Sequence, residues 1–384
     1  MLQQIYNGIN LKIIFFVACL EPGRDGVGDY TRILAGALTK LGHTITLLAL
    51  NDQFVTKEIA VKQNIDTFNL EVIRIPACLN ESMRFKRAKA WITLYDPEWI
   101  SLQFVIFSFH KKGLPFNLCN QLKVLVKGRK FHIMFHEIWV GMTNDSGKKM
   151  ILWGWVQKQI IRNLLLKLKP LLIHTQSQIY QAQLTKLGFL TMYLPLFGNI
   201  PVINQYSSVA PVDKLPSKEI SFVLFGSIHP GAPVETLVND LANYTNEYNV
   251  HVSLKIVGRN GTEQARWVRI WRSAGFNIEI SGELSAENVS EILSSSTFGI
   301  TTTPIALAEK SGTIAAMKEH GLKVLCVSLP WQLRHSLSFA APAGIMEYNG
   351  YNLNEILNCK FKLPVGSPIK IIAEQLIADF RNAV

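Results

Sequence analysis

The strongest constraint on the fold is the regular alternation of short apolar runs with helix-like segments along the whole chain. Short apolar runs separated by helical segments are typical of parallel sheets that helices cover on both faces. In the first half, helices are predicted most clearly at residues 27–41, 150–168 and 178–187, and Gly188 ends the last of these. Strands are predicted at residues 12–18, 44–50, 71–75, 99–104, 131–135, 171–175 and 191–194.

A stretch rich in proline, asparagine and serine interrupts this pattern at residues 195–216. Pro201, Pro211 and Pro216 exclude both helix and central strand there, so we place a domain boundary in this stretch. The alternation then resumes, with strands predicted at 220–225, 251–257, 277–280, 298–301 and 323–327 and helices at 233–245, 262–274, 285–295, 312–320 and 368–382.

The length also favours two domains, because a single core rarely extends over 384 residues. We predict an α/β protein with two doubly wound Rossmann-like domains, at residues 1–200 and 201–365. A last segment at 366–384 could return to the N-terminal domain. Doubly wound sheets bind ligands at the carboxyl ends of their strands, so the site is expected in a cleft between the two domains.

Composition and charge narrow the class of protein. The chain has 48% hydrophobic residues and a net charge of +11, which is typical of a globular protein with an anionic partner: nucleic acid, anionic lipid or a phosphorylated small molecule. No run of five like charges occurs, so nucleic acid is disfavoured. The five scattered cysteines have no metal-ligand spacing, and the first apolar run is too short to span a membrane; together they predict a cytoplasmic protein.

The most informative motif lies at residues 303–321, where a strand-like run is followed by Pro304 and then by a new helix. Free amides at a helix start attract phosphate, and here Lys310 adds a positive charge. Ser311 and Thr313 add hydroxyls, and Gly312 permits close approach to the backbone. This segment predicts a diphosphate site with Glu309 at its edge. A plain helix cap with a solvated lysine is the alternative.

A glycine-rich loop follows the first predicted strand at residues 21–30. Gly26 and Gly28, like Gly23, permit tight turning and close approach of a ligand to the next helix. The spacing matches neither the dinucleotide fingerprint nor the P-loop, which disfavours a dinucleotide-dependent oxidoreductase. A structural turn is the alternative.

His136 and Glu137 directly follow the strand predicted at 131–135, where a doubly wound sheet presents residues to a ligand. His136 is favoured as the residue that bonds a sugar hydroxyl or handles a proton, because neighbouring strand residues point to opposite faces. A structural histidine is an equal alternative. No metal-ligand spacing follows, so no metal or other cofactor is expected.

Glycine also marks strand ends in the second half. Gly226 and Ser227 follow one strand, and Arg259, which follows another, could pair with phosphate. The backbone of Gly282, Glu283 and Leu284 could line a base pocket. The helix at 150–168 carries a basic face and two tryptophans that would suit an anionic membrane, although core packing is the better interpretation.

Taken together, these loops resemble the GT-B glycosyltransferases, in particular the retaining family 4 enzymes that use nucleotide-activated sugars. The resemblance spans nearly the whole chain. Its most specific parts are Gly26-Val-Gly-Asp-Tyr30-Thr-Arg, Gln103 with Lys112-Gly-Leu-Pro115, His136-Glu-Ile-Trp139, Val257-Gly, Gly282-Glu-Leu and Glu309-Lys-Ser-Gly-Thr through His320-Gly321.

The resemblance implies roles for these residues. Gly26 and Gly28 would line the cleft, His136 would contact the transferred sugar, and Gly282, Glu283 and Leu284 would flank the base. Glu309 would match the first carboxylate of the family's E-x7-E motif, with Ser311, Gly312 and Thr313 on the diphosphate.

The sequence departs from the family pattern at two places. Met317 stands where the second carboxylate is expected, and Glu319 is shifted by two positions, about 200° around a helix. The usual Arg and Lys after the first strand of the second domain are replaced by Ser227-Ile-His229-Pro, so Lys310 or Arg259 would supply that charge.

The sequence therefore predicts a hexosyl-type glycosyltransferase. It would move a sugar from a nucleotide diphosphate sugar to a saccharide or lipid-linked acceptor, with retention, in glycan biosynthesis, and with peripheral contact to the inner face of the membrane as a further expectation. The alternatives are a sugar-nucleotide epimerase on the same architecture and a catalytically silent sugar-nucleotide-binding protein, which the missing second carboxylate suggests.

Overall fold

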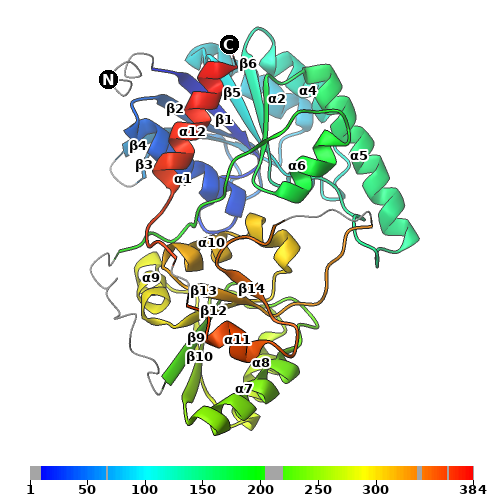
Figure 1. Cartoon of the computed structure of the whole chain (residues 1–384). Coiled ribbons are helices and arrows are strands. Elements are labelled where there is room, and N and C mark those ends of the chain that lie inside the picture. Colours follow the sequence, from blue (N-terminus) through cyan, green and yellow to red (C-terminus); the bar gives the residue numbers. More distant parts are fainter. Residues whose placement is uncertain (1–9, 66–67, 204–218, 335–339, 361–362, 384) are drawn as a thin grey trace. The chain divides into compact units, whose positions relative to one another are not determined.

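The structure, a computed structural model, describes residues 10–65, 68–203, 219–334, 340–360 and 363–383 (Figure 1). The chain divides into two compact units: unit 1 contains Met1–Pro195 and Ile369–Val384, and unit 2 contains Leu196–Pro368. Of the prolines that placed the domain boundary, Pro201 is described, whereas Pro211 and Pro216 lie outside the described residues.

Unit 1 is built on an eight-stranded sheet in the order β3-β4-β2-β1-β5-β6-β7-β8. All neighbouring strands are parallel except β3, which runs antiparallel to β4 at one edge. The central strands are almost wholly buried because helices cover both faces of the sheet. The strands are β1 Lys12–Val17, β2 Thr44–Asp52, β3 Ile59–Ile65, β4 Phe68–Pro76, β5 Trp99–Phe104, β6 Lys130–Phe135, β7 Leu172–Thr175 and β8 Met192–Tyr193.

The last helix of the chain, α12, packs against the sheet of unit 1 beside α1 (Figure 1). The ring of Phe380 stacks on Trp99 of β5 with the centroids 4.2 Å apart, and both side chains are fully buried. This contact fixes α12 over β5 and β6. The helices of unit 1 are α1 Gly26–Lys40, α2 Glu81–Tyr95, α3 Ile106–Phe109, α4 Leu118–Val126, α5 Lys148–Leu168, α6 Gln178–Thr185 and α12 Ile369–Asn382.

Unit 2 is built on a six-stranded, wholly parallel sheet in the order β11-β10-β9-β12-β13-β14. One face packs under α7, α8 and α11 around the buried Trp267 and Trp271, and the other packs under α9 and α10 around Val289 and Met317. Its strands are β9 Glu219–Phe225, β10 His251–Val257, β11 Asn277–Gly282, β12 Phe298–Thr301, β13 Lys323–Cys326 and β14 Ile345–Glu347. Its helices are α7 Val234–Tyr248, α8 Gln264–Ser273, α9 Ala286–Ser295, the 3-10 helix η3 Ile305–Lys310, α10 Gly312–Glu319 and α11 Leu353–Leu357.

The predicted fold class is confirmed: both units are doubly wound α/β sheets. The parallel pattern has one exception in unit 1: β3, which was not predicted, pairs antiparallel with β4. The helices α2, α3 and α4 lie between predicted strands of the first half, where helices were expected but given no bounds. Sequence reasoning missed β14 and α11, and the strand predicted at residues 191–194 is only Met192–Tyr193.

Within the described ranges, no helix combines the length and apolarity needed to cross a membrane. The basic helix α5 buries Ile161, Leu164 and Leu168 against the rest of unit 1, whereas Leu152 and Trp155 near its start are 63% and 58% exposed.

Candidate functional site

The candidate residues of unit 2 flank the point at which the strand order of its sheet reverses. From β9 the chain passes to β10 and then β11 on one side, whereas β12, β13 and β14 follow on the other. In doubly wound sheets, ligands bind beside the carboxyl ends of the two strands at which the order reverses, which in unit 2 are β9 and β12. Gly226 and Ser227 follow β9, and residues 302–313 follow β12.

The loop after β9 touches the first turn of α10. Gly226 has a φ of +98°, and a Cβ atom added there would lie 2.8 Å from Cγ2 of Thr313. Only glycine allows this approach without displacing Thr313. The structure thus brings Gly226 and Ser227 together with the predicted diphosphate segment.

Two polar residues that sequence reasoning missed hold this loop in place. Asn260 is buried, and its side-chain Nδ2 donates to the backbone carbonyl of Gly226 at 2.6 Å. The backbone carbonyl of Asn260 accepts from the amide of Ile228 at 3.1 Å. Thr302 accepts from the amide of His229 at 2.8 Å. The Asn260-Gly261 pair is a turn signal in the sequence, but its partner across the sheet edge is visible only in the fold.

The start of α10 has the local geometry of a helix cap. Ser311 is the N-cap residue, and its Oγ accepts from the amide of Ile314 at 3.4 Å and lies 3.1 Å from Oγ1 of Thr313. Among the described residues, the amides of Gly312 and Thr313 show no hydrogen bond. Because Ser311 caps only the Ile314 amide, these two remain free to donate.

Positive charge gathers beside this helix start. Lys310 is half-buried, and its ammonium lies close enough to His229 to act on its titration. Partial burial of the His229 ring lowers its pKa, and the charge of Lys310 lowers it further. A lowered pKa favours the neutral form of the His229 ring.

The position expected for the second carboxylate lies in the core. Met317 is fully buried, and its Sδ would lie 2.5 Å from a Cβ atom added at Gly299 of β12. A side chain at position 317 therefore packs under the sheet rather than toward a ligand. Glu309, in η3, is half-buried and acts electrostatically on Lys318.

Glu319 has a structural role. Its Oε1 accepts from the amide of Gly198 at 2.6 Å, and its carbonyl accepts from the amide of Gly366 at 2.8 Å. Burial raises the pKa of this carboxyl. Glu319 thereby fixes two flanking segments of unit 2 and does not replace the missing carboxylate.

The loops after β10 and β11 are joined by an ion pair. Nε of Arg259 lies 3.3 Å from Oε2 of Glu283, and both side chains are more than half exposed. Gly282, with a φ of +65°, accepts from the amide of Gly258 at 2.7 Å, and Leu284 packs against the core under α9. Arg259 is thus placed beside the predicted base-binding residues rather than beside Lys310.

In unit 1, the two glycines predicted to line the site differ in their surroundings. A Cβ atom added at Gly28 would lie 2.6 Å from the carbonyl oxygen of Cys19, so Gly28 allows α1 to pack closely on the end of β1. Gly26 is exposed and has open space around its Cα. Asp25 caps α1 by accepting from the amide of Val27 at 3.0 Å. Gly28 is therefore fixed by packing, and Gly26 is the one open to a ligand.

The acidic residue at the end of β2 is engaged internally. Asp52 is fully buried and pairs with Nε of Arg74 at 2.7 Å. Burial opposes its ionisation, but the hydrogen bonds from Arg74 and from the amides of Leu20 and Phe54 outweigh that effect and lower its pKa. Asp52 cannot then bind the ribose of a dinucleotide.

His136 lies at the carboxyl end of β6, next to the strand-order reversal of unit 1 between β1 and β5. It is 5% exposed, its Nε2 lies 2.9 Å from Oε1 of Gln103, and its ring packs edge-on to Tyr30. Burial lowers its pKa to about 3. His136 is therefore neutral at physiological pH and suits hydrogen bonding better than proton transfer.

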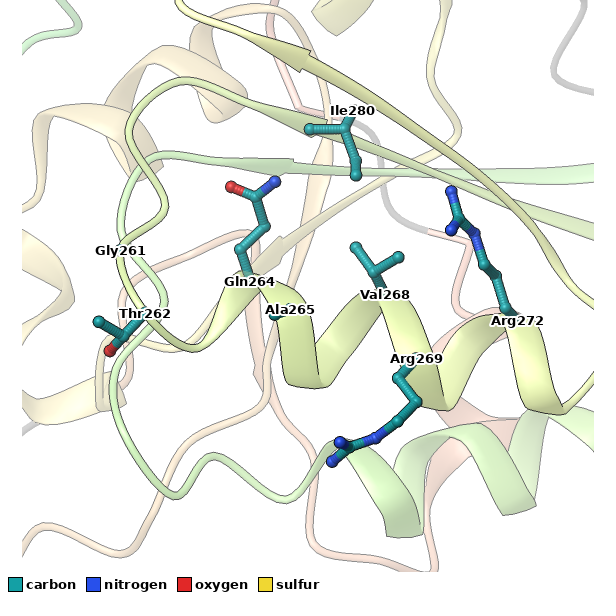
Figure 2. Close-up of a pocket in the computed structure, with 8 residues that line it drawn as sticks. All are labelled: Gly261, Thr262, Gln264, Ala265, Val268, Arg269, Arg272 and Ile280. Carbon is teal, nitrogen blue, oxygen red and sulfur yellow. The ribbon is translucent and has the colours of Figure 1, made fainter.

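An open hollow of about 770 Å³ lies in unit 2 between α8 and β11. Figure 2 shows Gln264, Val268 and Arg272 pointing from α8 toward Ile280, while Arg269 points away. None of the predicted site residues lines it. Among the described residues, no three His, Cys, Asp or Glu side chains gather in a way that could hold a metal ion.

Neither the models of known protein families nor the curated proteins include a match to this chain. Solved structures do match over nearly the full length. HepE of Anabaena, in complex with UDP and glucose, has a TM-score of 0.56 and 13% identity and covers 98% of this chain and 100% of its own.

Two further structures show the same relation. Starch synthase IV of Arabidopsis thaliana, bound to ADP and acarbose, has a TM-score of 0.54 and 10% identity, covering 98% of this chain and 99% of its own. A putative UDP-N-acetylglucosamine 2-epimerase of Listeria monocytogenes has a TM-score of 0.56 and 11% identity, covering 97% and 96%. At these identities the likeness shows the fold alone: the chain has the GT-B architecture.

Proposed function

We propose that this protein is a hexosyl-type glycosyltransferase (EC 2.4 class) that resembles the retaining family 4 enzymes. It would transfer a sugar from a nucleotide diphosphate sugar to an acceptor hydroxyl with retention. One observation carries the proposal: Gly226, the capped start of α10 and the charge of Lys310 lie together where the strand order of unit 2 reverses. The GT-B fold agrees with this proposal, because structural neighbours with the same fold were solved with UDP or ADP bound.

The chemistry required of this site is stabilisation of a leaving diphosphate. As the glycosidic bond breaks, negative charge develops on the phosphate oxygens. The ammonium of Lys310 and the amides of Gly312 and Thr313 are fixed donors that would bind this charge more strongly in the transition state than in the ground state. No cofactor enters this proposal.

A screen of donors tests the proposal. Unit 2 should bind nucleotide diphosphate sugars, so UDP-, ADP- or GDP-sugars should raise the melting temperature of the full chain. Release of the nucleoside diphosphate should then depend on an acceptor saccharide. A panel that gives neither a shift nor turnover would refute the proposal.

Two alternatives draw on specific observations. The buried Met317 leaves no second carboxylate, which favours a catalytically silent binding protein; this predicts a thermal shift without turnover. Epimerases share the fold, and an epimerase would invert one stereocentre of the sugar, or release UDP, without any acceptor. Product analysis by NMR separates the three outcomes.

The cytoplasmic location and the peripheral membrane contact are also proposals. Three apolar side chains of unit 1 are more than half exposed: Leu152 and Trp155 near the start of α5, and Phe116 just before α4. Lys148 and Lys149 lie in the first turn of α5. Exposed apolar side chains beside lysines suit an anionic bilayer and a lipid-linked acceptor. Co-sedimentation with phosphatidylglycerol vesicles, but not with phosphatidylcholine vesicles, is expected; equal recovery with both would contradict it.

A further inference from the structure

A line of six polar side chains crosses the sheet of unit 1 on the face that α12 covers; five of them are buried, and the side chain of the last, Asp379, is 13% exposed. The apolar rings of Trp99 and Phe380 pack around it, and His132 lies edge-on to Phe380 at 5.1 Å. Such a line is costly in a core unless every member is bonded. In order from the sheet edge, its members are His136, Gln103, Ser101, His132, His174 and Asp379.

Five successive hydrogen bonds join these side chains. They run from His136 Nε2 to Gln103 Oε1 at 2.9 Å, and from Gln103 Nε2 to Ser101 Oγ at 2.9 Å. Ser101 Oγ lies 2.8 Å from His132 Nδ1. His132 Nε2 lies 3.0 Å from His174 Nδ1, and His174 Nε2 lies 3.1 Å from Oδ2 of Asp379.

The strand geometry explains why these residues meet. Ser101 and Gln103 are two positions apart on β5, and His132 and His136 are four apart on β6 and its end, so each pair shares a face. Ser101 is the register partner of His132, and Met134 is that of His174. α12 then brings Asp379 onto the same face.

The carboxylate of Asp379, at one end of the line, fixes which atom donates in each hydrogen bond. A carboxylate only accepts, so His174 must donate from Nε2, which leaves its Nδ1 to accept from Nε2 of His132. Nδ1 of His132 then accepts from the hydroxyl of Ser101, and that oxygen accepts from the amide of Gln103. The remaining oxygen of Gln103 accepts from Nε2 of His136.

We infer that Asp379, as a positioning residue on the last helix, sets the tautomer of His136 through this chain of hydrogen bonds. All three histidines carry their proton on Nε2. His136 therefore presents an unprotonated Nδ1, an acceptor with no hydrogen-bond partner among the described residues.

The neutral state of His132 and His136 supports this direction. Burial lowers the pKa of His136 to about 3, and burial together with the nearby His174 and His136 holds the pKa of His132 well below its ordinary value. A neutral imidazole has one donor and one acceptor nitrogen, so a fixed donor at one end fixes the acceptor at the other.

A consequence for substrate class rests on the proposed function. An acceptor nitrogen at His136 recognises a group that can donate, such as a sugar hydroxyl, and disfavours a carboxylate or keto oxygen in the same place. The line of hydrogen bonds would thus select sugars that place a hydroxyl, and not a carboxylate or keto group, at His136.

NMR of the full chain labelled with 15N and 13C at histidine tests the tautomers directly. A scalar coupling across the hydrogen bond should join His132 Nε2 to His174 Nδ1, with the proton attached to His132. His136 should show a protonated Nε2 and an unprotonated Nδ1. A proton on Nδ1 of any of the three rings, including a doubly protonated His174, would overturn the inference.

Variants test whether Asp379 sets the direction. In Asp379→Asn the terminal group can also donate, and in Ser101→Ala the chain is interrupted, so Nδ1 of His136 should become partly protonated in both. Glu374→Gln removes a carboxylate from the same helix, at an exposed position paired with Lys370, and should leave the spectrum unchanged. An unchanged His136 tautomer in folded Asp379→Asn and Ser101→Ala would refute the role of the chain; if neither folds, the wild-type coupling decides.

An activity readout separates this inference from the proposed function. Asp379→Asn should lower kcat/KM about three- to tenfold, the loss of one neutral hydrogen bond, with unchanged affinity for the nucleoside diphosphate. If no donor is turned over by the wild-type protein, the proposed function fails while the tautomer measurement still stands. An unchanged kcat/KM in a variant whose His136 tautomer has shifted would remove the hydroxyl contact.

Discussion

Replacing Lys310 by alanine should weaken binding of a nucleoside diphosphate far more than binding of its nucleoside. A hydrogen bond to a charged group contributes about 1.5–3 kcal/mol, which corresponds to about 10- to 150-fold in affinity. Lys310 is only half-buried, so solvent screening places the effect at the lower end, about tenfold. The nucleoside makes no contact with the ammonium in this proposal and should lose less than about twofold.

Isothermal titration calorimetry with the nucleoside diphosphate identified by the donor screen measures the Lys310→Ala effect. The matched control is Lys255→Ala, which removes a lysine of the same unit that lies on β10 near Glu279, 3.8 Å away. The control should bind both ligands as the wild type does. Equal losses for diphosphate and nucleoside, or no loss for either, would remove Lys310 from the site. In Lys310→Ala the pKa of His229 should rise, because the charge of Lys310 lowers it in the wild type.

Three further changes probe the packing that supports the site. Gly28→Ala should cost about 1–3 kcal/mol in urea unfolding because its Cβ would lie 2.6 Å from the Cys19 carbonyl, whereas Gly26→Ala, in open space, should change little; similar losses would refute this distinction. The lowered pKa of Asp52 means that its contribution to stability is present above its unfolded pKa of about 3.9 and is lost as pH falls through the folded value. The free energy of unfolding should therefore fall more steeply between about pH 5 and 3 in the wild type than in Asp52→Asn, and parallel curves would contradict it. Met317→Glu should unfold more easily by about 3 kcal/mol or more, since it buries an unpaired charge; an equally stable variant with tighter ribose binding would show that position 317 faces the ligand.

The sequence predicted the fold well because the information lies in local patterns. Runs such as β1 and β5 are continuously apolar, and a buried parallel strand needs nothing else to be recognised. β3 was missed because it is an edge strand, with Lys62 and Gln63 among its apolar residues, and only its pairing with β4 identifies it. A helix was expected between the strands at 71–75 and 99–104, but the bounds of α2 could not be predicted because its apolar residues do not gather strongly on one face.

The candidate site was predicted only in part, for a different reason. Glycine loops and a helix start are contiguous in sequence, so residues 311–313 could be proposed from the sequence alone. The contact of Gly226 with Thr313 and the chain from His136 to Asp379 join residues that are far apart in sequence. Isolated polar residues such as Ser101 and His174 in apolar runs were the available signal, but strand register is needed to show that they meet.

The register of α10 limits which side chains can contact a ribose. Met317 faces β12 and Glu319 bonds the backbone of Gly198, so neither side chain of this helix turn is available to a ribose. Under the proposed function, recognition of the nucleoside would then fall to the loop after β11, where Glu283 is already paired with Arg259. A paired, exposed carboxylate contributes little binding energy, because solvent and its partner compete with the ligand. The diphosphate should therefore dominate affinity, and the donor site should distinguish bases less sharply than it distinguishes diphosphates from monophosphates.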